Sequence, residues 1–318
     1  MDIISDSDHP LWPNLTFEPS PNVTFPASAA HEATVRPLAT SLSKGNLHDH
    51  LTTFTSFYTR YYKSSTGKDS AEWLYKQVNS TITASGAVEY GANVRIFEHE
   101  WGQPSIIATI PGRSNKTIVI GAHQDSINLF LPSLLPAPGA DDDGSGTVTI
   151  LEAMRVLLTS DEVAHGRSTN TIEFHWYSAE EGGLLGSQAL FAEYRRQERE
   201  IQAMFQQDMT GYVAGTLKAG HEESIGVIND FVDPGLTEFI KVLISTVRRS
   251  YHLLSWSDHK ASTPIVLPSL FPHLLECYLL TTRTVLQYSL HLYHLRLCVL
   301  RPRFGPQVWI SFRVCHRV

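Results

Sequence analysis

Short apolar runs recur along the chain between polar segments that contain Gly or Pro. They have the length and the β-branched content of buried strands. The runs cover residues 93–98, 105–110, 117–121, 171–177, 201–207 and 224–228. Pro111-Gly112 separates the second run from the third, so we predict that these two strands form an antiparallel pair.

Stretches with apolar residues spaced for one face of a helix lie before and between these runs. They cover about residues 47–62, 70–78, 144–159, 184–199 and 234–249. In the first stretch, one stripe predicted to face the core contains Leu51, Phe54, Phe57, Tyr58 and Tyr61. The alternation of strands and helices predicts an α/β fold: a three-layer α/β/α sandwich with a mixed, mainly parallel central sheet.

Three regions of the chain differ in composition. Residues 1–38 are rich in Pro, Ser and Asn, which is typical of a flexible leader; the alternative is the remnant of a pro-segment. Residues 39–262 carry the strand and helix pattern and are predicted to form one domain. Residues 263–318 are an atypical tail, in which Cys277 to Val318 contain no Asp or Glu but six Arg. A shifted reading frame or a mis-spliced end would produce such a tail, and a genuine basic tail is the alternative.

Charge and hydropathy exclude two classes of partner. The 318-residue chain has a net charge of −7, whereas nucleic-acid binding needs clustered Lys and Arg. No apolar run approaches the ~18–20 residues of a membrane span, so we expect no membrane partner either. Acids occupy the first eight residues, where a signal peptide needs basic and then apolar residues, so no signal peptide is visible.

Two further features concern the compartment of the protein. Four N-glycosylation sequons suggest a secreted glycoprotein, and a lost N-terminus would reconcile them with the missing signal. They begin at Asn14, Asn22, Asn79 and Asn115. The three cysteines all follow residue 276, and they form neither a disulfide framework nor a thiolate metal site.

Acidic and histidine side chains recur at the ends of three predicted strands. They are His123 and Asp125 after the third strand, Asp141–Asp143 in the next loop, Glu180 and Glu181 after the fourth strand and Asp208 after the fifth. An open α/β sheet binds its ligands at the carboxyl ends of its strands. Three consecutive carboxylates cannot all be buried as anions without a countercharge. The pattern therefore predicts a cation site at this edge of the sheet.

The residue types suggest how such a site would work. The two oxygens of Asp142 could bridge two cations, and Asp143 is expected to have only the structural role of a helix N-terminus. Of the adjacent Glu180 and Glu181, one could bind a metal while the other stays free as a base. Taken singly, each motif also fits a polar loop, an acidic first helical turn or a strand-ending turn.

Four strings together carry a family resemblance. Residues 121–126, 137–146, 178–187 and 208–210 resemble the zinc aminopeptidases of peptidase family M28, and they are most similar to secreted fungal leucine aminopeptidases. Residues 53–77 are similar to the start of the mature domain in that group. The resemblance covers about residues 30–262, which would make residues 39–262 a catalytic domain that is incomplete at its C-terminus.

The resemblance implies two zinc ions on an α/β/α sandwich. Asp142 would bridge the two ions, His123 and Asp208 would complete one of them, and Glu181 would bind the other. An N/O ligand set without Cys suits zinc in a hydrolytic site.

The resemblance also implies a reaction and its setting. Glu180 would be the base that takes a proton from water and delivers it to the leaving amine, and Asp125 would orient His123. The activity would be zinc-dependent removal of an N-terminal residue, preferably apolar and leucine-like. The substrates would be peptides or proteins with a free N-terminus, and we expect a secreted monomer.

The C-terminal part departs from the family pattern. The family supplies its last zinc ligand as a His, usually followed by Thr, and nothing after His259 matches. Four later histidines have none of the expected surroundings; they are His273, His291, His294 and His316. Trp256 and His252 stand where the family has a cysteine pair. We therefore expect the second zinc site to be weakened, and the activity of this particular chain stays open.

Other readings remain. One is a non-catalytic or inactive relative that keeps the sheet but lacks the last zinc ligand. Another is a single-zinc glutaminyl cyclotransferase on a similar sheet. A carboxypeptidase would need a basic anchor for the substrate carboxylate, and Arg113 and Lys116 lie close to His123 in sequence.

Overall fold

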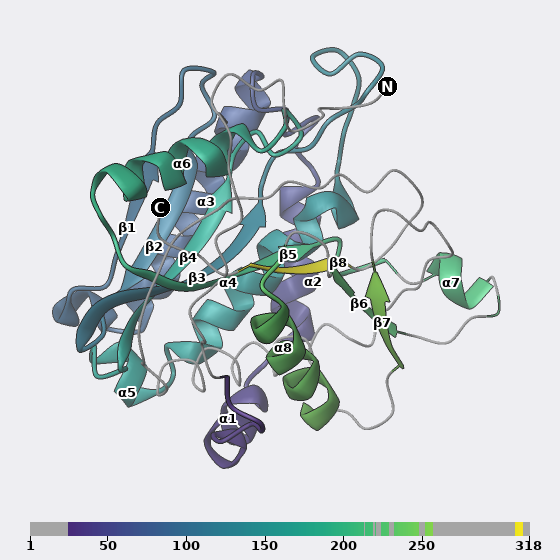
Figure 1. Ribbon diagram of the computed structural model, residues 1–318. Coiled ribbons are helices and arrows are strands. Elements are labelled where there is room, and N and C mark those ends of the chain that lie inside the picture. Colours follow the sequence, from purple (N-terminus) through teal and green to yellow (C-terminus); the bar gives the residue numbers. More distant parts are fainter. Residues whose placement is uncertain are drawn as a thin grey trace, which may run out of the picture.

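A mixed sheet forms the centre of the computed structural model, which describes residues 25–212, 214–218, 220, 224–228, 232–247, 252–256 and 309–313 (Figure 1). Its eight strands have the order β1-β2-β4-β3-β5-β8-β6-β7. They are β1 (Asn93–Phe97), β2 (Ser105–Ile110), β3 (Ser114–His123), β4 (Asn170–Tyr177), β5 (Ile201–Asp208), β6 (Ser224–Ile228), β7 (His252–Trp256) and β8 (Trp309–Arg313). The central strands β4, β3 and β5 are parallel, which brings their carboxyl ends to one edge.

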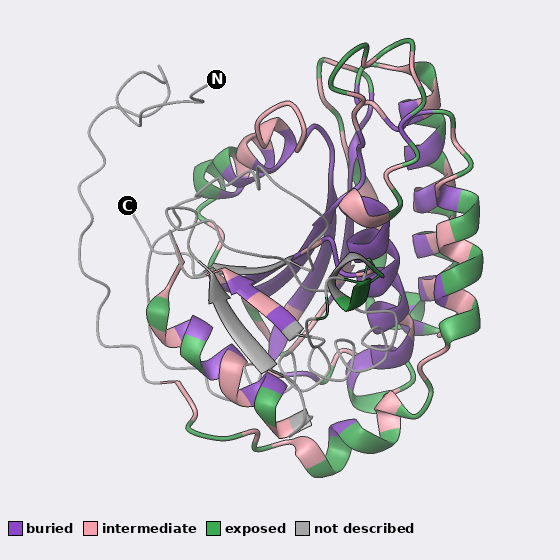
Figure 2. Cartoon of the chain, turned by 90° about the vertical axis from the view of Figure 1, so that its right-hand side faces the viewer, coloured by how far each residue is buried: buried purple, intermediate pink, exposed green. Residues whose placement is uncertain are grey.

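Helices cover both faces of this sheet, with α6 on one face and α3 and α4 on the other (Figure 1). The helices of the described residues are α1 (Glu32–Ala39), α2 (Lys44–Phe54), α3 (Ser65–Ala84), α4 (Gly146–Leu157), α5 (Asp161–Ala164), α6 (Leu185–Arg196), α7 (Ala214–Lys218) and α8 (Pro234–Val247). Two shorter helical turns are η1 (Ala87–Tyr90) and η2 (Ala140–Ser145). Buried residues concentrate in the sheet and on the inward sides of the helices (Figure 2). The predicted α/β/α sandwich is confirmed.

The predicted antiparallel pair of residues 105–110 and 117–121 is wrong, because β4 lies between them. Strand β2 pairs antiparallel with β4, and β3 pairs parallel with β4 on its other side. The segment after Pro111 runs against the start of β4: the Arg113 amide donates to Ser168 O at 2.8 Å. A Cβ on Gly112 would lie 2.2 Å from Asn170 O, so only glycine permits this crossing. The Pro-Gly turn therefore carries the chain past β4 rather than back along β2.

The first two predicted helices differ from the observed ones. Helix α2 ends at Phe54 instead of about residue 62, because the Thr55 and Ser56 hydroxyls donate back to main-chain carbonyls of the last turn. Residues 55–62 are not helical, and Tyr58 is exposed rather than buried. Helix α3 begins at residue 65, where the Ser64 side chain accepts a hydrogen bond from the Gly67 amide at 2.9 Å.

Part of the C-terminal tail enters the sheet. Residues 309–313 form β8, which is antiparallel to β5 and parallel to β6. This segment therefore supplies a strand, which the sequence pattern did not predict. The Ser257–His259 segment and the four late histidines lie outside the described residues.

A buried polar network occupies the α6 face of β4. The Glu173 carboxylate accepts hydrogen bonds from His175 Nε2 at 2.9 Å, from the Tyr194 hydroxyl at 2.6 Å and from Arg199 Nη2 at 2.9 Å. His175 Nδ1 lies 2.9 Å from the Tyr177 hydroxyl. Burial alone would raise the pKa of Glu173, but His175 and Arg199 outweigh it and lower that pKa. The network thus stabilises a buried anion on β4, the strand that leads to Glu180.

Replacing Glu173 by Gln tests the weight of this network. The substitution leaves Arg199 and the Tyr194 hydroxyl without their anionic partner, so we expect a loss of about 3 kcal/mol in the free energy of unfolding. Urea unfolding followed by circular dichroism would measure it. Glu238→Gln is the matched control, because the Glu238–Lys241 pair lies on the surface. Equal effects of the two substitutions would contradict the structural role of Glu173.

Candidate metal centre

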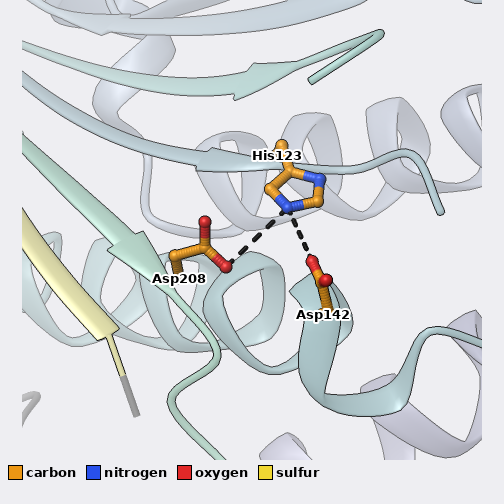
Figure 3. A group of neighbouring side chains, drawn as sticks. All are labelled: His123, Asp142 and Asp208. Atoms are coloured by element: carbon orange, nitrogen blue, oxygen red, sulfur yellow. Dashed lines mark ion pairs between the residues drawn. The ribbon is translucent and has the colours of Figure 1, made fainter. Parts of the chain in front are cut away.

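The carboxyl ends of β3 and β5 and the turn η2 bring three possible metal ligands together. His123 ends β3, Asp208 ends β5 and Asp142 lies in η2 (Figure 3). Gly121 is paired with Gln206, so two residues further along the parallel strands His123 and Asp208 are neighbours on the same face. One ligand atom from each of the three residues lies within 4.8 Å of the others.

The distances around His123 suit a cation-binding site. His123 Nε2 lies 2.9 Å from Asp142 Oδ1, 3.8 Å from Asp208 Oδ1 and 3.9 Å from Glu180 Oε2. His123 Nε2 and Asp208 Oδ1 are buried, and they face each other and Asp142 through these ion-pair contacts. Buried polar groups are almost always satisfied, and a cation coordinated by all three groups would satisfy them. Nitrogen and carboxylate donors without sulfur fit zinc.

Asp125 connects His123 to the two glutamates. Its carboxylate accepts the main-chain amides of Glu180 at 3.0 Å and Glu181 at 3.1 Å. His123 Nδ1 lies 3.2 Å from the main-chain oxygen of Asp125 and 3.5 Å from its carboxylate. Asp125 therefore positions the turn after β4 as directly as it positions the imidazole, a role that sequence reasoning missed.

The turn after β4 has a strained backbone. Ala179, directly before Glu180, has φ +55, and Met209, directly after Asp208, has φ +46. A left-handed conformation costs a residue with a side chain about 1–2 kcal/mol. Strain of this kind accumulates at functional sites, where the surrounding contacts hold it in place. The side chain of Glu180 is 13% exposed and faces His123.

Glu181 is not one of the three converging ligands. Its amide binds Asp125, and its carboxyl group lies close enough to Asp142 and Glu180 to be affected by their charges. The structure therefore groups three of the four predicted metal ligands and places Glu181 in the same electrostatic environment.

Asp143 ties the three segments of the site to one another, and its role is larger than the predicted helix N-terminus. Its carboxylate accepts the main-chain amide of His123 at 3.1 Å, of Gly146 at 2.8 Å and of Met209 at 3.1 Å. These amides belong to the end of β3, the start of α4 and the residue after β5. One fully buried side chain thus fixes the spacing between the ends of β3 and β5, where His123 and Asp208 lie.

Asp141 fixes the loop that follows β5. Its Oδ1 accepts the amides of Gly211 and Tyr212, each at 2.8 Å. Burial raises the pKa of Asp141 to about 6, although these hydrogen bonds oppose the shift. Ser145 assists, because its hydroxyl donates to Asp141 O at 2.8 Å and accepts the Thr210 amide at 2.7 Å. Within the acidic triplet, Asp141 and Asp143 bind main-chain amides, whereas Asp142 faces His123.

Arg60 is a buried cation that closes the loop between β3 and η2. Its guanidinium donates to the main-chain oxygens of Gln124, Pro138 and Gly139 and lies 4.2 Å from the ring centroid of Phe54. Burial lowers the pKa of Arg60 to about 10. Its donors bind carbonyl oxygens rather than the carboxylates of the site. A single Arg within an aromatic run gives little signal in the sequence, and this residue was missed.

The carboxylates repel one another in the absence of a metal. Burial, followed by the negative charges of Asp208, Asp125 and Asp142, raises the pKa of Glu180 to about 8. Burial and the charges of Asp142 and Glu180 raise the pKa of Glu181 to about 9. Burial alone would lower the pKa of His123, but the carboxylates outweigh it and raise that pKa. The site lacks positive charge, which a divalent cation would supply.

Comparisons of sequence and structure relate this chain to known proteins. A family model described as "Peptidase family M28" matches residues 105–262. Leucine aminopeptidase 1 of Coccidioides posadasii is 61% identical over 254 residues, which are 78% of this chain and 66% of that protein. Leucine aminopeptidase 1 of Uncinocarpus reesii is 58% identical over 275 residues, or 85% and 69% of the two chains. The chain spans about two thirds of the length of these curated relatives.

Solved structures share the fold. The Legionella pneumophila LapA aminopeptidase has a TM-score of 0.71 at 23% identity and covers 87% of this chain and 81% of its own. A Bacteroides thetaiotaomicron glutaminyl cyclase bound to N-acetylhistamine has a TM-score of 0.54 at 13% identity, with coverages of 78% and 99%. At these identities the likeness concerns the α/β fold alone.

Zinc is expected to stabilise the protein more at high pH than at low pH. Without metal, the raised pKa values of Glu180 and Glu181 mean that the folded state binds protons that the unfolded chain releases above about pH 4.5. Their stabilising effect is complete below that pH and is lost as the pH rises through about 8 to 9. Zinc needs deprotonated ligands, so the zinc-induced rise in Tm should be larger at about pH 8 than at about pH 6.

Differential scanning fluorimetry with and without zinc measures this effect. A His123→Ala variant is the control, and its Tm should respond to zinc much less at either pH. A zinc response of wild type that is equal at both pH values would contradict the electrostatic account.

Asp143→Asn should destabilise the fold. The amide group of Asn brings two donors to a position where three main-chain N–H groups already point, so at least one buried donor loses its acceptor. We expect a loss of about 1–3 kcal/mol in the free energy of unfolding, measured by urea titration. Asp49→Asn is the control, because the Asp49 side chain is 82% exposed. Equal stability of the two variants would refute the role given to Asp143.

Proposed function

Because this chain belongs to peptidase family M28, we propose that it is a metallo-aminopeptidase, a hydrolase that removes the N-terminal residue of peptides. The preferred residue would be apolar and leucine-like. The relatives that support this reading are named leucine aminopeptidase 1 and are 55–61% identical to the chain. The substrates would be peptides or proteins with a free N-terminus.

The observation that carries the proposal is the convergence of the buried His123 Nε2 and Asp208 Oδ1 with Asp142. We propose that His123, Asp142 and Asp208 hold one zinc ion and that Asp142 and Glu181 share a second. When bound, zinc would lower the pKa of water and polarise the carbonyl of the scissile bond. The raised pKa of Glu181 marks the missing positive charge on its side of the site.

Glu180 is the proposed general base. It is largely buried, faces His123 at 3.9 Å and is held by the hydrogen bond from its amide to Asp125. Its carboxylate would accept a proton from the attacking water and deliver that proton to the amine nitrogen as the peptide C–N bond breaks. The surrounding acids would also attract the positively charged α-amine of the substrate. A carboxypeptidase would instead face repulsion between this acidic site and the substrate carboxylate.

The proposal extends to a secreted, monomeric glycoprotein. The sequon residues Asn79 and Asn115 are exposed on α3 and β3, where a glycan could be attached. Asn14 and Asn22 lie outside the described residues. Within the described ranges, no helix has the length and apolar content that crossing a bilayer demands.

The second zinc would be the weaker one in this chain. In the part of the chain that the structure describes, Glu181 and Asp142 are the ligands proposed for it, and the late histidines considered as a third ligand fall outside the described residues. We therefore keep two alternatives: an inactive relative, and a single-zinc glutaminyl cyclotransferase that would use the His123, Asp142 and Asp208 group.

Glu180→Gln should separate metal binding from catalysis. Removing the base should lower kcat for a leucine chromogenic amide by about 10²–10⁴-fold, while the zinc content stays at the wild-type value. His123→Ala should lose both zinc and activity, and the surface variant Glu193→Gln should lose neither. Zinc content is measured by atomic absorption.

The same assay distinguishes the alternatives. Release of leucine from the amide supports the aminopeptidase, whereas cyclisation of a glutaminyl peptide without leucine release supports the cyclotransferase. A chain that binds zinc and catalyses neither reaction is the inactive relative. Full leucine release by the Glu180→Gln variant would overturn the role of Glu180.

A further inference from the structure

The loop between β3 and η2 exposes an unusual set of apolar side chains. Among them, Leu129, Phe130 and Leu134 are 76%, 82% and 67% exposed. Together with the exposed Leu131 and Tyr58, these residues form what we call the apolar rim. The loop projects beyond the body of the molecule at the carboxyl edge of the sheet (Figure 1). Contiguous exposed apolar side chains of this size mark interaction sites.

The loop that carries the rim is held rigidly outward. Arg60 binds its far end at Pro138 and Gly139, and the Ser126 hydroxyl donates to Ala137 O at 2.7 Å across its base. The Tyr58 hydroxyl donates to Leu134 O at 3.0 Å. These contacts, made by residues outside the tip, keep the apolar side chains from folding back onto the core.

Both ends of the loop that carries the rim adjoin residues of the candidate metal centre. Asp125 precedes the loop, and Asp142 follows it. Leu129 lies four residues after Asp125, so the two Cα atoms are at most about 14 Å apart. An extended peptide covers the same distance with about four residues. A peptide whose first residue lies at the metal centre can therefore reach the rim with its next few residues.

The distribution of charge indicates what the rim would bind. Residues 126–140 contain no charged side chain, whereas the centre beside them gathers Asp142, Glu180, Glu181 and Asp208. A peptide with a positively charged N-terminus and an apolar continuation complements both parts. An anionic membrane does not, because the acidic centre and the net charge of −7 would repel it.

We propose that the apolar rim is an exosite for the substrate chain beyond the scissile bond, which selects peptides with apolar residues at their second to fourth positions. The inference rests on the proposed aminopeptidase function and names the peptide class on which it acts best. Phe130 and Leu129 would provide most of the contact area, because they are the most exposed.

The test compares a short and a long substrate in the zinc-loaded full chain. The loop variant is Leu129→Ser/Phe130→Ser, and the control is Val88→Ser, which alters an exposed apolar residue of η1. For leucyl peptides with apolar residues at positions two to four, the loop variant should lose about tenfold in kcat/KM. Leucyl-triglycine and the leucine chromogenic amide offer the rim no apolar side chain, so their kcat/KM should be unchanged. Val88→Ser should leave kcat/KM unchanged for all three substrates.

A binding measurement separates this proposal from the proposed function. Fluorescence anisotropy of the same apolar leucyl peptide, labelled at its C-terminus, should show weaker binding to the loop variant even where no peptide is cleaved. Cleavage failure with rim-dependent binding would therefore refute the peptidase and retain the exosite.

Three results would overturn the exosite. The first is an equal loss of kcat/KM for the amide and the apolar peptide, and the second is equal affinity of wild type and loop variant for the peptide. The third is that the rim binds a membrane or a second copy of the chain instead of the substrate. The last is detected as loop-dependent sedimentation with phosphatidylcholine vesicles, or as a dimer that the loop variant abolishes in size-exclusion chromatography.

Discussion

The three hydrogen bonds that the buried Asp143 carboxylate accepts define the geometry of the metal centre. They join the end of β3, the start of α4 and the residue after β5 to one side chain. His123 and Asp208 end the two strands that this carboxylate connects. Parallel pairing brings the two strand ends to the same edge, and Asp143 fixes how they are spaced. Asp142 faces His123, whereas its neighbours on both sides, Asp141 and Asp143, bind main-chain amides.

A second constraint is electrical. Four carboxylates lie within 3.9 Å of the His123 imidazole, and the donors of the nearby buried cation, Arg60, bind carbonyl oxygens. Burial, reinforced by the neighbouring negative charges, disfavours ionisation of Glu180 and Glu181 and raises their pKa values. A bound divalent cation would relieve this repulsion. Residues with left-handed backbone, Ala179 and Met209, lie directly beside Glu180 and Asp208.

The sheet divides its polar residues between two purposes. On the α6 face of β4, Glu173 and His175 satisfy each other and their neighbours with hydrogen bonds, and they have no access to solvent. At the carboxyl edge of the same sheet, His123 and Asp208 converge with Asp142. Gly121 allows the transition between these regions, because any Cβ there would lie 2.7 Å from Tyr177 and Gln206. Glu173 and His175 thus support the strand, whereas the polar groups at the strand ends converge at the candidate metal centre.

The sequence alone determined the fold class and indicated which side chains converge at the carboxyl edge of the sheet. Hydrophobic periodicity located β2, β5 and α8 within a residue or two, and acids at strand ends indicated a cation site containing His123, Asp142 and Asp208. Local patterns carry this information because burial depends on spacing along the chain. Sequence could not show the order of β2, β4 and β3, since a Pro-Gly turn is equally compatible with a hairpin and with a crossover. Nor could it reveal Arg60, the double role of Asp125 or the bracing by Asp143. Those roles depend on contacts between residues tens of positions apart, which exist only once the sheet has brought the strand ends together.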